Sequence, residues 1–253
     1  MLMVISPAKT LDTDTPASTA LSTQCEFLDD AERLIGILRP MRQAEIARLM
    51  ELSEKLAALN VARYESWKRP LTPDNAKQAV LTFNGDVYEG LDAVSMSEAQ
   101  LTCAQRHLRI LSGLYGLLRP LDLMAPYRLE MGTALANPSG KDLYAFWGER
   151  IGAALNKELQ SHSSRVLINL ASDEYFRAVR GLAYPVVTPV FQERKAGGYK
   201  VVSFSAKRAR GLMARYAIEH RMDDPEDLVD FDMEDYRFDP QASTPDRMVF
   251  RRG

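Results

Sequence analysis

Short apolar runs separated by longer helical stretches are the feature that most narrows the possible folds of this chain. Leu2–Ile5, His107–Leu111 and Arg165–Leu170 have the length and apolar content of buried strands. Helical patterns of a dozen residues or more separate these runs. This alternation is typical of α/β or α+β domains. We therefore expect an α+β fold in which many helices surround a mixed sheet.

The second half of the chain is expected to add a hairpin and a final strand. Pro185–Glu193 and Tyr199–Phe204 flank residues 196–198 (AGG), which predicts two antiparallel strands joined by a tight turn. Met248–Arg251 is expected to close the sheet as an edge strand.

Residues 26–67 carry apolar side chains at helical spacing, and Pro40 and Ser53 divide the stretch into three helices, with Ser53 as an N-cap. No linker rich in Pro, Gly or Ser divides the chain. Residues 1–253 are therefore expected to form a single compact domain in which residues 26–106 are a helical subregion.

The overall charge is nearly balanced, with 32 Lys and Arg against 34 Asp and Glu. The whole chain therefore has no basic excess that would indicate nucleic acid, and a phosphate site must be local. The apolar run at residues 1–5 is too short for a membrane span and lacks the basic region of a signal peptide. We expect a cytoplasmic protein without membrane contact.

The potential metal ligands are scattered along the sequence. Cys25 and Cys103 form no CxxC pattern, and His107, His162 and His220 form no HExxH or Cys/His motif. We expect reduced thiols, no dedicated metal site and no cofactor.

Two adjacent segments carry opposite charge: residues 194–221 are basic and residues 223–239 are acidic. On a helix over residues 206–220, Lys207, Arg208 and Arg215 fall on one side around Gly211, while apolar residues occupy the other side. Cations in a first helical turn and a glycine in a helix are both unfavourable, the glycine by up to about 1 kcal/mol. A phosphate bound beside this helix would explain both the early cations and the glycine. A solvated basic face that partly pairs with the acidic segment is the alternative.

Polar residues also follow two predicted strands. Ser172 and Glu174 come after the strand at 165–170, and Ser6, Lys9 and Asp12 come after the first strand. Carboxyl ends of strands are the usual ligand sites of α/β sheets, so these residues share one rim if the strands are neighbours. A plain N-cap explains Ser172 equally well.

Gly113 and Gly116 follow another predicted strand with GxxG spacing, which favours a strand-to-helix turn over a nucleotide-binding loop. Arg119, Arg128 and Glu130 are the ionisable residues nearby that are expected to line a site. Neither a Ser-His-Asp or Cys-His order nor a GxSxG elbow is present, so no catalytic class is indicated.

Several strings together resemble the YaaA family of bacterial peroxide-stress proteins, and the resemblance extends from residue 2 to about residue 251. The strings are ISPAKTLD at 5–12, SEKLAA at 53–58 (with Asn60, Arg63 and Tyr64), FNGDVY at 83–88, residues 111–132, FWG at 146–148, INLASDEYF at 168–176 and AKRARGLM at 206–213.

The resemblance implies a cytoplasmic protein that lowers intracellular free iron during hydrogen peroxide stress and limits oxidative damage. It also implies DNA binding and a family-specific fold with a helix-hairpin-helix element and a basic cleft. By position, that element maps onto Met41–Met50 and Ser53–Trp67, with the turn at residues 51–52.

Two functions follow as expectations. The first is non-enzymatic, salt-sensitive binding of double-stranded DNA that is structure-selective and not base-specific, because nothing in the sequence indicates base readout. Its contact residues would be Lys207, Arg208, Arg210, Arg215, Lys55, Arg63, Arg69 and Arg119.

The alternative is an enzyme acting on a phosphorylated or nucleotide-like small molecule. Its candidate catalytic residues are Lys9, Arg128, Glu130, Ser172 and Glu174, joined by Arg119 and Lys207. Direct iron binding by the acidic segment is a third hypothesis.

Overall fold

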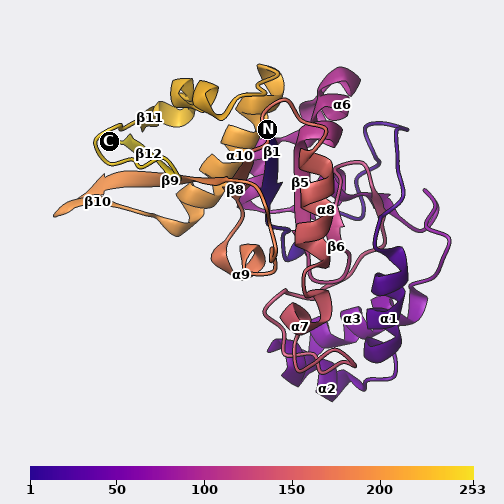
Figure 1. Cartoon of the computed structure of the whole chain (residues 1–253). Coiled ribbons are helices and arrows are strands. Elements are labelled where there is room, and N and C mark those ends of the chain that lie inside the picture. Colours follow the sequence, from indigo (N-terminus) through magenta and orange to yellow (C-terminus); the bar gives the residue numbers. More distant parts are fainter.

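A mixed eight-stranded sheet forms the centre of the computed structural model, which describes all residues 1–253 (Figure 1). The strand order is β11 (Arg237–Phe238), β12 (Arg247–Arg252), β9 (Val186–Lys195), β8 (Leu167–Leu170), β1 (Leu2–Ile5), β5 (Leu108–Ser112) and β6 (Gly116–Leu118), with β10 (Gly198–Lys200) paired to β9. Strands β12, β9, β8, β1 and β5 are parallel, whereas β6, β10 and β11 are antiparallel to their neighbours. The predicted α+β class is confirmed.

Strand β1 lies between β5 and β8, and all four of its residues are buried. Met3 pairs with Leu108 on one side and with Ile168 on the other. Because a parallel strand covered on both faces needs apolar side chains at every position, the run LMVI has no polar alternation. The carboxyl ends of β1 and β8 consequently lie side by side at one edge of the sheet.

Three local predictions need correction. The strand at the end of the chain, β12, is not an edge strand, because β11 pairs with its outer side. The second hairpin strand ends at Lys200, since α10 (Ser203–Glu219) begins soon after it. The GxxG segment joins β5 to the antiparallel strand β6, with Gly116 at φ 67°, and does not lead into a helix.

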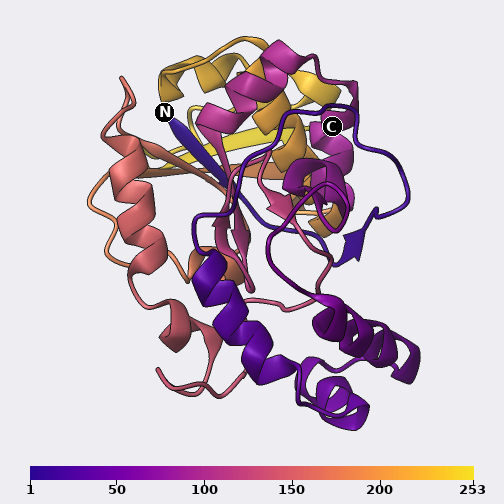
Figure 2. The ribbon, with the colours of Figure 1, turned by 90° about the vertical axis from the view of Figure 1, so that its right-hand side faces the viewer.

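Helices cover the sheet on both sides. Helices α5 (Asp86–Leu91), α6 (Glu98–His107) and α10 lie on one side, and α8 (Arg150–Leu159) lies on the other (Figure 2). Backbone contact between α5 and α10 is very close: a Cβ on Gly211 would stand 1.8 Å from the carbonyl oxygen of Val87.

The first three helices of the predicted subregion, α1 (Leu28–Leu38), α2 (Gln43–Met50) and α3 (Glu54–Ser66), lie below the sheet in Figure 1 together with α7 (Leu143–Trp147), whereas α5 and α6 from the same range cover the sheet. Ser53 accepts a hydrogen bond from the backbone N–H of Leu56, which confirms it as the N-cap of α3. Helices α2 and α3 form the expected pair, joined at Glu51 in the left-handed conformation (φ 52°). Whether this pair acts as a helix-hairpin-helix element stays a prediction.

The remaining elements are short. They are the helices α4 (Ala79–Thr82) and α9 (Asp173–Phe176), the 3₁₀ turns Ala93–Ser95, Pro225–Asp230 and Met233–Asp235, and the strand pairs β2 (Thr10–Leu11) with β4 (Phe83–Asn84) and β3 (Lys77–Gln78) with β7 (Leu123–Met124). One connected cluster of 70 buried residues runs from Met1 to Phe250. None of the helices combines the length and hydropathy needed to cross a membrane.

Candidate functional site

Two serines from neighbouring parallel strands meet at the centre of the candidate site. Ser6 follows β1 and Ser172 follows β8; the hydroxyl of Ser6 donates to that of Ser172 over 3.2 Å. Ser6 Oγ in turn accepts the backbone N–H of Ser172 at 2.9 Å. The shared rim predicted for these residues is confirmed by the pairing of β1 with β8. The Ser172 side chain does not cap α9, so its role is to join the two strand ends.

A polar cavity of about 470 Å³ opens beside these serines. Figure 1 shows α9, which follows β8, at the edge of the sheet that faces α7 and the helical subregion. The cavity brings together residues from the loop after β1, the start of α5, the loop after β7, α9 with the residue before it, and α10. Among its lining residues are the predicted Lys9, Glu130, Ser172, Glu174, Lys207 and Arg210.

The two predicted carboxylates are already engaged. Glu130 Oε1 accepts hydrogen bonds from Arg128 Nε and Nη2 at 3.0 and 2.9 Å and lies 3.4 Å from Lys9 Nζ. Glu174 Oε1 accepts the backbone N–H of Gly132 at 2.9 Å. These contacts fix the positions of both acids, and Glu130 pairs with two of the nearby cations, Arg128 and Lys9.

Arg210 is the unusual member of the cavity. Its Nε is buried and has no hydrogen-bond partner. Burial lowers the pKa of its guanidinium, and the nearby carboxylate of Asp173 opposes that shift. Lys207, one helical turn earlier on α10, lines the same cavity and is exposed. Because an unpaired buried donor is costly, Arg210 is suited to bind an anion that enters the cavity.

The cations continue beyond this cavity. A small adjoining hollow shares Lys9 and Glu130 with the main cavity and adds Arg128. The Tyr64 hydroxyl donates to the carbonyl oxygen of Arg128 and ties this hollow to α3. Burial and the neighbouring Arg128 lower the pKa of Arg63, which lines the next cavity, of about 320 Å³. We call this path the basic groove; its cations are Lys9, Arg63, Lys68, Arg128, Lys207 and Arg210.

The chemistry that this arrangement supports is anion binding. Neither histidine nor cysteine lines the main cavity. Ser6 and Ser172 are bonded to one another, and neither hydroxyl is hydrogen-bonded to a basic or acidic side chain that would activate it as a nucleophile. The groove therefore has the donors of a phosphate site without a recognisable catalytic pair.

The structure does not show the free cluster of cations that was expected around Gly211. Gly211 is buried against α5, so close helix packing explains this glycine and no backbone is free for an anion. Arg208 Nε donates to Glu234 Oε1 at 2.6 Å, in the acidic segment. Arg215 bonds to Glu219 at 2.8 Å and to the carbonyl oxygen of Asp92, also at 2.8 Å. Of this cluster, Lys207 alone lines the cavity.

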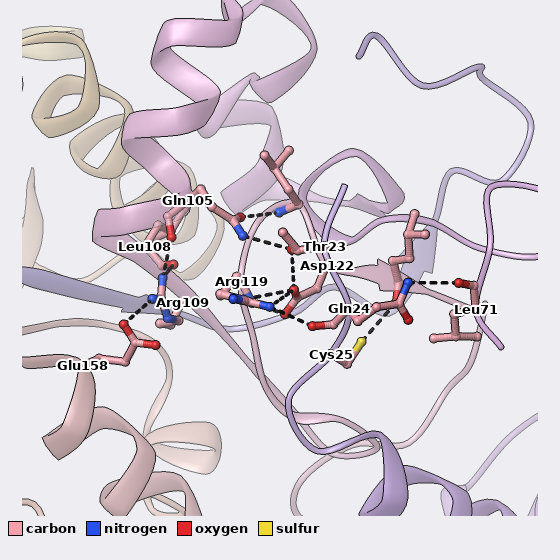
Figure 3. A network of polar contacts seen from close by, with 12 residues as sticks. Thr23, Gln24, Cys25, Leu71, Gln105, Leu108, Arg109, Arg119, Asp122 and Glu158 are labelled. Atoms are coloured by element: carbon pink, nitrogen blue, oxygen red, sulfur yellow. Dashed lines mark hydrogen bonds and ion pairs between the residues drawn. The ribbon is translucent and has the colours of Figure 1, made fainter. Parts of the chain in front are cut away.

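Three further cations from the DNA hypothesis lie outside the groove. Arg119 is held by the buried carboxylate of Asp122 (2.9 Å) and by the carbonyl oxygen of Gln24 (2.7 Å), within the network of Figure 3. Arg69 pairs with two acids on α1. Lys55 is exposed on α3. The structure thus assigns Arg119 and Arg69 to packing between segments.

Sequence reasoning missed the part of the site that α5 supplies. Asn84, Gly85, Asp86 and Tyr88 line the main cavity, and the Tyr88 hydroxyl donates to the carbonyl oxygen of Ser6 at 3.1 Å. Their string, FNGDVY, contributed to the family resemblance but matches no chemical motif. The available signal was its polar residues between two apolar stretches.

An α+β protein with a cavity lined by lysine, arginine and serine at the carboxyl ends of parallel strands is the class that the fold and site define. Residues 1–242 match the family model described as peroxide stress protein YaaA. UPF0246 proteins from Aromatoleum aromaticum and Azoarcus sp. are 60% and 61% identical over all of this chain and 99% of their own lengths. One from Burkholderia ambifaria is 59% identical over all of this chain and 98% of its own length. The chain belongs to the YaaA family of peroxide stress proteins.

Proposed function

We propose that this peroxide-stress protein binds DNA through the backbone phosphates, with the basic groove as the contact surface. The observation that carries the proposal is the set of six cations that line three cavities between the sheet edge and α3, of which the first two share Lys9 and Glu130. Spaced cations along a groove suit a chain of phosphates better than a single one.

The groove offers donors to phosphate and little means to read bases. Its exposed lysines, Lys9, Lys68 and Lys207, are flexible point charges, while Arg128 is oriented by Glu130. Such contacts position a nucleic acid without carrying sequence information. We therefore propose structure-selective binding of double-stranded DNA. From the family resemblance we further propose a cytoplasmic protein that helps to limit free iron and oxidative damage.

Removing the three groove lysines together (Lys9→Ala, Lys68→Ala, Lys207→Ala) is expected to weaken duplex binding about tenfold or more. The slope of log affinity against log salt should flatten by up to about 3, since each phosphate contact contributes about 0.9. Fluorescence anisotropy with a labelled duplex at several salt concentrations measures both quantities.

The matched control removes three exposed lysines elsewhere, Lys141, Lys157 and Lys200, and so changes the net charge equally. The control should bind like the unmodified protein. An equal loss of duplex affinity in both triple variants would mean that net charge alone causes the loss. It would contradict the proposal that the groove is the contact surface.

A phosphorylated small molecule, such as a nucleotide, is a second candidate for the main cavity. The observation in its favour is the volume of about 470 Å³, which lies in the range of small-molecule sites. Five residues that line the cavity carry the ionisable or hydroxyl groups expected of an enzyme site. Those residues are Lys9, Glu130, Ser172, Glu174 and Lys207.

Calorimetric titration with AMP, inorganic phosphate and adenosine tests this second candidate. AMP and phosphate should bind, adenosine should not, and Arg210→Met should abolish binding, because the unpaired guanidinium supplies the anion contact. Failure of AMP and phosphate to bind the unmodified protein would contradict the small-molecule hypothesis. The proposal of DNA binding would be unaffected by that result.

A further inference from the structure

The amino ends of the central strands carry a second polar cavity, at the opposite end of β1 from the basic groove. Its volume is about 400 Å³, and none of its lining residues is hydrophobic. Among those residues are His107, His162 and Asp223, which are brought together from three parts of the chain. No function described above uses them.

Each of the three residues lies where a long element begins or ends. His107 is the last residue of α6 and directly precedes β5, His162 follows α8, and Asp223 follows α10. Their wide separation in sequence explains why spacing alone predicts no metal site. The fold nevertheless places two imidazoles and a carboxylate in one cluster.

The dimensions of the cluster are close to those of a metal site. The potential ligand atoms all lie within 4.8 Å of one another, and the two imidazole ring centroids are 5.0 Å apart. Zinc bonds of about 2.1 Å place tetrahedral ligands about 3.4 Å apart, so side-chain shifts of about 1 Å would complete the coordination.

Neighbouring groups already orient two of the ligands. His107 Nδ1 lies 3.1 Å from the carbonyl oxygen of Met1, the kind of backbone contact that fixes a metal-binding imidazole. Asp223 accepts a hydrogen bond from the Ser163 hydroxyl and holds the α-ammonium group of Met1 at 2.8 Å. The carboxylate therefore already binds one cation, and its position is supported from two sides.

The arginines around the cavity are paired with acids or exposed to solvent. Arg109, the buried arginine of this cavity, is neutralised by Glu158 at 2.7 Å. Arg119 is paired with Asp122. Arg106 is exposed to solvent, which screens its charge.

We propose that His107, His162 and Asp223 bind a divalent transition-metal ion such as Zn²⁺, Co²⁺ or Fe²⁺. Two imidazoles with one carboxylate suit these ions, whereas Mg²⁺ and Ca²⁺ prefer oxygen ligands alone. Three protein ligands leave a coordination position for water.

Anaerobic titration of the full-length apo protein tests the site. One equivalent of Co²⁺ should produce visible d–d absorption bands, and Zn²⁺ should displace the Co²⁺ and remove them. Mg²⁺ in excess should leave the bands unchanged. The same stoichiometry is expected for Fe²⁺ in a bound-metal assay after gel filtration.

The variants His107→Ala and His162→Ala should each weaken Co²⁺ binding at least tenfold, and the double variant should show no bands. His220→Ala is the matched control, because His220 is an exposed histidine outside the cluster and should leave binding unchanged. Circular dichroism confirms that the variants are folded. Absence of bands in the unmodified protein, or unchanged bands in the folded double variant, would overturn the proposal.

Discussion

Replacing Gly211 with alanine is expected to lower the free energy of unfolding by about 3 kcal/mol or more. The new Cβ would stand 1.8 Å from the carbonyl oxygen of Val87 and 2.8 Å from the backbone nitrogen of Leu91. Both contacts are to backbone atoms of α5, which cannot rotate away as a side chain would. The clash can be relieved only if α5 and α10 move apart. We therefore expect a loss of stability at the upper end of the range usual for overpacked cores. Urea denaturation measures the loss.

Gly36→Ala is the control, because Gly36 also lies within a helix and a methyl group added to it would meet no atom within 4 Å. This change should stabilise the protein by about 0.5–1 kcal/mol, the helix-propensity difference alone. Since α10 carries Lys207 and Arg210, Gly211→Ala should also weaken DNA binding. Equal stability of the two variants would show that helix contact does not constrain Gly211.

Removing the acid that neutralises a buried arginine should produce the second large effect. Arg109 has a side chain that is 4% exposed, and its Nη2 donates to Glu158 Oε2 at 2.7 Å (Figure 3). Its Nη1 donates to the carbonyl oxygens of Gln105 and Leu108. Glu158→Ala leaves the guanidinium buried without a counter-charge, so we expect a loss of about 3 kcal/mol in urea denaturation.

A double-mutant cycle separates this charge effect from lost packing. In an Arg109→Met background no buried cation is left, and Glu158→Ala should then cost less than about 1 kcal/mol, because Glu158 is partly exposed. A cost of about 3 kcal/mol in both backgrounds would mean that Glu158 acts through packing and not through its charge.

The sequence predicts those features of this fold that depend on local patterns. Pro40 and Ser53 separate three helices because one is a helix breaker and the other is an N-cap. Ser6 and Ser172 could be placed at one rim because the carboxyl ends of adjacent parallel strands coincide. Buried strands such as β1 are visible as unbroken apolar runs.

What the sequence does not reveal is which distant residue each side chain meets. Helical periodicity places Arg208 and Arg215 on a polar face, yet only the fold shows that Glu234 and Glu219 pair with them. Gly211 is unfavourable in a helix, and it is needed because α5 packs closely against it. That packing is known only once the position of α5 is known.

The same limitation applies to His107, His162 and Asp223, which form a cluster only after three elements have assembled. The edge position expected for the last strand failed for a related reason. β11 is too short, at two residues, to be recognised as a strand from its sequence.

The central position of β1 has a consequence for synthesis. Leu2 pairs with Leu167, so this strand must wait for about 165 further residues to be translated, roughly ten to thirty seconds at ribosomal speed. Until β5 emerges this wholly apolar segment has neither neighbour, and one side stays unpaired until β8 follows. Contacts between such distant residues form slowly. Nascent chains of this protein should therefore depend on a holding chaperone until β8 has left the ribosome.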